Sequence, residues 1–295
     1  MGDLVRLTLA YWPPLAWDTL IALLGREALP GVELVEGGRY GRTMRLEGKR
    51  GVVFAAHPAG EARSHLGVDV SPSLLPVLMP LLARLRHLFD LDAEPTAVDG
   101  HLQRGGLGAL VARRPGLRIP GALDGFEAAF RALLGGRIGM AATETARRVV
   151  EALGEPVVTG YAGLSRIAPD AARVAEAGAA RLAALGVSRR TAAVLVSLAR
   201  ALAGGTLWLE PGSDVAAAHR ALLAVDGIGE RLATTILMRA MYWPDAFPAS
   251  DRVLQRAAGE SSPRALRARA EEWRPWRAYA ALHLWLDAER PIGDA

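Results

Sequence analysis

The spacing of apolar residues changes near residue 114. The stretch 4–11 alternates apolar and polar residues in the two-residue period of a half-buried strand. Further short strand candidates, separated by Gly or Pro, lie at 32–38, 42–48, 50–57 and 65–72. Apolar residues recur at helical spacing over 17–29 and 71–92. We therefore predict an α+β domain over residues 1–114.

Strand patterns stop after residue 115, and helical spacing takes over. Gly or Pro separates most of the helical stretches, which is typical of a compact bundle of short helices. We predict this bundle over residues 115–295. The stretch "RRPGLRIPG" at 113–121 is expected to link the two domains. No internal repeat and no low-complexity tail interrupts this organisation.

Charge and composition narrow the chemistry. The formal net charge is +4 and the sequence pI is about 9.9, which permits a polyanionic partner without requiring one. Lys49 is the only lysine, so a mechanism that needs a catalytic lysine must use it. The chain has no cysteine, which excludes disulfides, thiolate zinc sites and iron–sulfur clusters.

No segment of the sequence points to a membrane or to secretion. The chain does not open on a signal-peptide pattern, and its most apolar run, 73–85, contains two prolines and an arginine. The six histidines lack the spacing of a metal site. Met1 favours a complete chain over a fragment. We expect a cytoplasmic, nucleoid-associated monomer.

The stretch "VDGIGERLATTI" at 225–236 contains two glycines between helical patterns. Gly227 and Gly229 can adopt positive φ and let another backbone come close, and N–H groups beside the following helix suit a phosphate oxygen. An ordinary helix–helix turn would show the same residues. The pattern alone leaves both interpretations open.

A lone carboxylate follows in "FPASDRVLQR" at 247–256. Ser250 is expected to cap a helix, with Asp251 in its first turn, where the helix dipole favours an acidic residue. Asp251 could therefore have a purely structural role. The order of the hairpin and this carboxylate is more specific than either feature alone.

Three stretches in sequence carry a family resemblance: "LLAVDGIGERLATTILMRA", "FPASDRVLQRA" and "EEWRPWRAYAALHLWLDAE". In this order they resemble the helix-hairpin-helix superfamily of DNA base-excision glycosylases, and within it the bacterial 3-methyladenine DNA glycosylase II (AlkA) type. The resemblance runs nearly end to end. It implies an N-terminal α+β domain similar to half of a TATA-binding protein, followed by an all-α glycosylase bundle with its helix-hairpin-helix at about 221–240.

The resemblance also implies residue roles. The N–H groups of the hairpin at Gly227 and Gly229 would hold a DNA phosphate. The carbonyls of Leu223, Val225 and Ile228 would hold a monovalent cation, and no other cofactor is expected. Asp251 would face the sugar of a nucleotide flipped out of damaged double-stranded DNA.

The same resemblance implies a reaction class. Members that also cleave the strand carry a lysine where this chain has Arg231, so we expect a monofunctional glycosylase that leaves an abasic site. Alkylated purines are the expected substrates. Three alternatives stay open: neutral lesions such as hypoxanthine or ethenoadenine, a catalytically silent DNA-binding protein, or a piece of a larger repair scaffold.

The expected base pocket departs from the family pattern. Trp285 matches one of the family's stacking rings, although a core position would explain it equally well. The other matching positions lack rings: Leu23, Arg231, Thr235 and Arg252. Arg137, after Gly136, matches the side chain that fills the gap left by the flipped base. A phosphate contact is the alternative role for Arg137.

Overall fold

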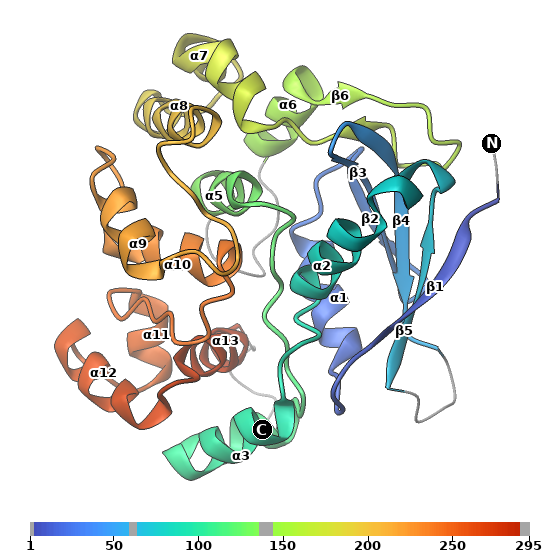
Figure 1. Ribbon diagram of the computed structural model, residues 1–295. Coiled ribbons are helices and arrows are strands. Elements are labelled where there is room, and N and C mark those ends of the chain that lie inside the picture. Colours follow the sequence, from blue (N-terminus) through green and yellow to red (C-terminus); the bar gives the residue numbers. More distant parts are fainter. Residues whose placement is uncertain (1–2, 59–63, 136–143, 290–295) are drawn as a thin grey trace.

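The computed structural model describes residues 3–58, 64–135 and 144–289. A sheet with two helices on it forms one side of the molecule, and a bundle of short helices forms the other (Figure 1). The α+β class predicted from the sequence is confirmed. No helix in the described ranges is both long and apolar enough to cross a membrane.

Every expected strand of the first domain is present in one antiparallel sheet of order β1-β5-β4-β3-β2. The strands are β1 (Val5–Ala10), β2 (Glu33–Glu36), β3 (Arg39–Leu46), β4 (Lys49–Ala56) and β5 (His65–Val70). Gly37 and Gly38 join β2 to β3 with φ of 55° and 73°. Positive φ at both central residues gives a two-residue hairpin the twist of its strands.

Helices α1 (Trp17–Arg26) and α2 (Leu78–Leu88) pack on the sheet and lie toward the helical bundle (Figure 1). A 3₁₀ turn at Pro72–Val77 precedes α2. Leu20 of α1, Val68 of β5 and Leu85 of α2 are fully buried in one apolar cluster. Burial of this cluster fixes the sheet against the two helices.

The remaining helices form the bundle. They are α3 (Pro95–Leu102), α4 (Gly108–Arg113), α5 (Gly125–Leu134), α6 (Glu144–Leu153), α7 (Ala171–Ala184), α8 (Arg189–Ala203), α9 (Val215–Leu223), α10 (Glu230–Ala240), α11 (Arg252–Ala257), α12 (Pro263–Arg269) and α13 (Arg277–Ala288). A π turn, Gln103–Leu107, joins α3 to α4, and a 3₁₀ turn, Ala270–Trp273, follows α12.

The expectation that strands end near residue 115 is wrong in one place. Two short strands, β6 (Glu155–Pro156) and β7 (Arg166–Ile167), pair with each other beside β3. The N–H groups of Ser165 and Arg166 both donate to the carbonyl of Gly31 at 2.8 Å. This segment is extended because its backbone bonds to the first domain, a long-range cause that a local pattern does not reveal.

The connection between the halves is buried. Val98 of α3 and Val111 of α4 precede residue 114, yet they share an apolar cluster with Trp273 and α13. In the expected linker, Arg118 is fully buried and donates to the carbonyls of Asp90 and Ala93. Helices α3 and α4, at the end of the predicted first domain, therefore pack in the same core as α13.

Candidate active site

Two helices joined by a tight turn form the first part of the site. α9 ends at Leu223 and α10 begins at Glu230. Between them, the N–H of Ile228 donates to the carbonyl of Val225 at 3.0 Å. The Ile228 side chain is buried in the cluster shared by α8, α9 and α10, so the turn is anchored in the core. The helix-hairpin-helix expected at 221–240 is therefore present.

The two glycines of the turn differ in role. Gly227 has φ of 90°, and a Cβ there would lie 2.5 Å from Cγ2 of Val194 on α8. A Cβ at Gly229 would meet nothing within 4 Å. Gly229 is also the N-cap of α10 and offers no side-chain cap to its first N–H groups. Gly227 fixes the turn, and Gly229 leaves these N–H groups accessible to an anion.

Asp251 is the N-cap of α11. Its Oδ1 accepts hydrogen bonds from the N–H of Val253 at 2.8 Å and of Leu254 at 3.1 Å, and the residue is 7% exposed. The prediction that Ser250 caps this helix is wrong, because the backbone is still extended at Asp251 (φ −72°, ψ 119°) and the helix begins one residue later. The two bonds to Oδ1 orient the carboxylate and leave Oδ2 for other contacts.

The segment that returns the chain from α10 to α11 is fixed on α13. The N–H of Ala278 donates to the carbonyl of Pro244 at 2.9 Å. The guanidinium of Arg277 donates to both carboxylate oxygens of Asp245, at 2.7 and 2.9 Å. Tyr242, with φ of 56°, redirects the chain after α10. The separation of hairpin and carboxylate is thus set by α10, roughly 16 Å long, and by a docked loop.

The residues expected at the base pocket divide into a buried and an exposed group. Trp285, Leu23 and Thr235 are 1%, 2% and 3% exposed. The Thr235 hydroxyl donates to the carbonyl of Arg231 at 2.8 Å. Arg231 and Arg252 are both exposed. Three of these five residues are therefore buried and two are exposed.

Trp285 lies in the core in this conformation. It shares an apolar cluster with Leu23 and with Leu254 of α11, the helix that Asp251 caps. Its indole Nε1 is buried and has no hydrogen-bond partner among the described residues. Arg137 and Gly136, expected next to the flipped base, lie outside the described residues. The role of Arg137 stays a prediction.

Sequence comparisons show which family the chain belongs to. Residues 6–124 match the model of the AlkA N-terminal domain. The chain is 35% identical over 279 residues to DNA-3-methyladenine glycosylase 2 of Escherichia coli. The match covers 94% of this chain and 96% of that protein. The chain belongs to the DNA-3-methyladenine glycosylase II family.

A second relative is considerably longer than this chain. The chain is 37% identical over 296 residues to the "probable bifunctional transcriptional activator/DNA repair enzyme AlkA" of Mycobacterium tuberculosis. The match covers 98% of this chain but 58% of that protein. The chain thus spans little more than half the length of this relative.

Solved structures share the glycosylase fold at lower identity. A 3-methyladenine DNA glycosylase from Archaeoglobus fulgidus superposes with a TM-score of 0.75 at 21% identity, covering 96% of this chain and 97% of that one. The 8-oxoguanine glycosylase/lyase of Clostridium acetobutylicum, solved with double-stranded DNA, gives 0.70 at 18% identity, covering 98% and 96%. The fold is therefore that of the helix-hairpin-helix DNA glycosylases.

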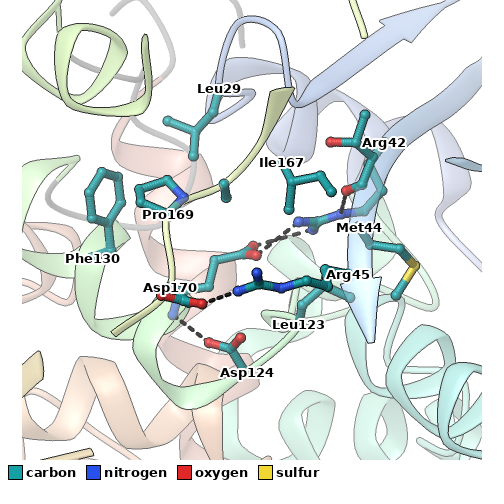
Figure 2. Close-up of a pocket in the computed structure, with 13 residues that line it drawn as sticks. Leu29, Arg42, Met44, Arg45, Leu123, Asp124, Phe130, Ile167, Pro169 and Asp170 are labelled. Atoms are coloured by element: carbon teal, nitrogen blue, oxygen red, sulfur yellow. Dashed lines mark hydrogen bonds and ion pairs between the residues drawn. The ribbon is translucent and has the colours of Figure 1, made fainter. Parts of the chain in front are cut away.

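A hollow lies away from Asp251, between β3 and α5. Its volume is about 60 Å³, and Leu29, Phe130 and Pro169 form part of its lining (Figure 2). Figure 2 also shows Arg45 ion-paired with Asp170 across it. Of the charged residues in its lining, Arg42 is ion-paired with Glu127 and Arg45 with Asp170, while Asp124 caps α5.

Buried ion pairs beside this hollow join the sheet to the bundle. Arg42 of β3 donates to Glu127 of α5 at 2.9 Å, and Arg131 donates to Glu33 at 2.6 Å. Burial opposes ionisation of Glu127, but the guanidinium groups of Arg42 and Arg131 outweigh it and hold its pKa below the usual value. We assign these residues to the domain junction. Sequence reasoning missed them, because the paired residues lie up to 98 positions apart.

Proposed function

We propose that this chain is a monofunctional DNA glycosylase that flips an alkylated purine out of duplex DNA and excises it, leaving an abasic site. The observation that carries the proposal is the placement of Asp251. Its carboxylate is fixed at a helix start by two backbone bonds, after a hairpin whose α10 amides are open to a phosphate. Family membership supports this interpretation.

The residue types fit the chemistry. An alkylated purine such as 3-methyladenine is cationic, so the electron pair of the broken C1′–N bond leaves with the base and neutralises it. The sugar becomes an oxocarbenium-like cation that a fixed carboxylate stabilises. Water then adds to C1′ and gives up a proton. Asp251 supplies the negative charge and a candidate acceptor for the attacking water.

No lysine is available for strand cleavage at the hairpin. By the family resemblance, Arg231 matches the position where strand-cleaving members carry lysine, and arginine stays protonated and is a poor nucleophile. Lys49 lies at the start of β4, in the other domain. A Schiff base with the sugar is therefore not part of the proposal.

The exposed arginines favour alkylated bases over the neutral lesions that are the second candidate substrates. Arg231 and Arg252 lie at the surface, where their charges can meet DNA phosphates and water. Guanidinium groups directed at the base would repel a cationic purine. Their exposure removes the main reason to expect a shift toward hypoxanthine or ethenoadenine.

The proposal includes a cation and a location. The Val225 carbonyl already accepts one hydrogen bond and keeps a second lone pair, and neutral carbonyl oxygens of Leu223, Val225 and Ile228 suit a monovalent ion. The described residues contain no cluster of three or more His, Asp or Glu that could hold a metal. We propose that the chain acts as a monomer on chromosomal DNA in the cytoplasm.

The product of the reaction tests this function. A duplex with one 7-methylguanine should yield free base and an intact strand that breaks only after alkali treatment. Borohydride present during the reaction should trap no protein–DNA adduct, while a lysine-dependent glycosylase/lyase assayed in parallel should be trapped. Strand cleavage without alkali, or a trapped adduct, would show that an amine of this chain takes part.

A further inference from the structure

The helix α8 lies directly against the hairpin. Val194 of α8 is the residue that a Cβ at Gly227 would meet, at 2.5 Å. Val194 and Ile228 also belong to the same apolar cluster. Side chains of α8 that neighbour Val194 are therefore carried close to the proposed phosphate site.

Helical geometry places one arginine of α8 toward the hairpin and another away from it. At about 100° per residue, Arg190 lies about 40° around the helix from Val194, whereas Arg189 lies about 140° from it. Both arginines are exposed. Ala193 and Ser197, also exposed, continue the stripe of Arg190 along the helix. We call Arg190, Ala193 and Ser197 the α8 face.

The hairpin itself needs a neighbouring positive charge to hold a phosphate well. Residues 224–230 carry two exposed carboxylates, Asp226 and Glu230, and the nearest arginine in the chain is Arg231, in the first turn of α10. His219 lies 3.3 Å from Glu230 and offsets its charge only when protonated. A phosphate at the open amides of α10 would meet these acidic groups, so a cation from another element would add to the positive charge of Arg231.

Arg190 has the freedom to supply that cation. Among the residues that the structure describes, no carboxylate forms an ion pair with it. The N-terminus of α8 is already capped, because the Ser188 hydroxyl accepts from the N–H of Thr191 at 3.1 Å. The guanidinium group, and not the helix end, is therefore the feature of α8 that can meet a ligand.

We propose that Arg190 binds a DNA backbone phosphate close to the one held by the hairpin, and that the α8 face extends the DNA contact surface. This inference rests on the DNA function proposed above. Arg190 is about 6 Å along the helix from Val194, comparable to the rise of about two nucleotides in one strand. Ala193 and Ser197 are small enough to let the backbone approach. Arg190 is thus a positioning residue that acts on all duplexes alike.

The test compares Arg190→Ala with Arg189→Ala, a matched control on the same helix turn that points elsewhere. Fluorescence anisotropy would measure Kd for an undamaged duplex and for one with a tetrahydrofuran abasic-site analogue, from 50 to 300 mM salt. For Arg190→Ala we expect an approximately tenfold rise in Kd on both duplexes. The slope of log Kd against log salt should fall by about 0.9, as for one lost phosphate contact.

The control decides between a specific contact and general charge. Arg189→Ala should keep the native salt slope, and Arg190→Lys should recover most of the affinity lost in Arg190→Ala. Equal salt slopes for Arg190→Ala and Arg189→Ala would overturn this inference. If the native chain still binds DNA and releases the base in that case, the proposed function stands. A native chain that binds neither duplex would overturn both.

Discussion

Asp251 combines a helix cap with a proposed catalytic charge. Its position could be read from the sequence, because a single carboxylate follows the hairpin at the start of a helical pattern. Its capping bonds could not, since the choice between Ser250 and Asp251 depends on where the backbone leaves the extended conformation. The cap explains how the carboxylate is held, and the same bonds make asparagine a suitable substitute for testing the charge alone.

Arg231 is the residue at which substrate choice can be tested. Because it is exposed at the start of α10, its charge should add little repulsion to a cationic base. We expect the native chain to release 7-methylguanine faster than hypoxanthine, and Arg231→Trp to keep that order. If Arg231 instead faced the base, repulsion on the order of a few kcal/mol could exceed the 1–3 kcal/mol of one stacking ring.

The measurement is the ratio of single-turnover release rates for the two bases. Arg264→Trp, on the exposed surface of α12, serves as the control for adding a tryptophan. A native chain that prefers hypoxanthine, with the order reversed only by Arg231→Trp, would contradict the outward orientation and favour neutral lesions as substrates.

At the scale of elements, local patterns identified the five strands of the sheet and the hairpin helices well. Strands β6 and β7 were missed, because pairs of two residues have no readable period and their extended form depends on contacts with Gly31. The stretch "EEWRPWRAYAALHLWLDAE" at 271–289 is interrupted at Arg274 and Pro275, between the 3₁₀ turn and α13. Non-local contacts therefore account for the two missed strands, whereas Pro275 ends the preceding helical turn locally.

The hairpin supplies a prediction at this scale. Gly229→Leu adds a side chain where a Cβ meets nothing within 4 Å, so the fold should survive, but the side chain should obstruct a phosphate at the α10 amides. We expect weaker binding by at least tenfold to damaged and undamaged duplexes alike, measured by anisotropy. Ala217→Leu, at an exposed site on α9, serves as the control for adding a leucine. A loss confined to lesion-bearing DNA would contradict the phosphate site.

At the scale of the whole molecule, the two halves meet at buried polar groups that the sequence did not reveal. Asp90, after α2, accepts hydrogen bonds from the hydroxyl groups of Tyr242 and Tyr279 and, at 3.0 Å, from the N–H of Ile119. These partners lie 29 to 189 positions away in the chain. The predicted division at residue 114 could not include such contacts, because they depend on how the elements assemble.

Asp90 makes the stability of the junction depend on pH. Burial raises its pKa from 3.8 to about 6, although the tyrosine hydroxyl groups favour the charged form. The folded state therefore binds a proton more readily than the unfolded state. The contribution of protonated Asp90 to the free energy of unfolding is complete below about pH 4. It is lost as the pH rises through 6, a difference of roughly 3 kcal/mol.

The prediction concerns the difference between the native chain and Asp90→Asn. The free energy of unfolding of the native chain, minus that of Asp90→Asn, should fall between pH 4 and pH 7 in denaturant titrations. The subtraction is needed because burial lowers the pKa of His283 to about 4, which gives an opposite trend over this range. A flat difference for Asp90→Asn would refute the assignment.

The most direct test of the account is base release by Asp251→Asn. Asparagine keeps the size and the helix cap but removes the charge, so thermal stability and binding to an abasic-site duplex should stay close to native. Single-turnover release of 7-methylguanine should fall at least 100-fold, about 3 kcal/mol of transition-state stabilisation. A folded, DNA-binding Asp251→Asn variant that releases the base at a near-native rate would contradict the central claim.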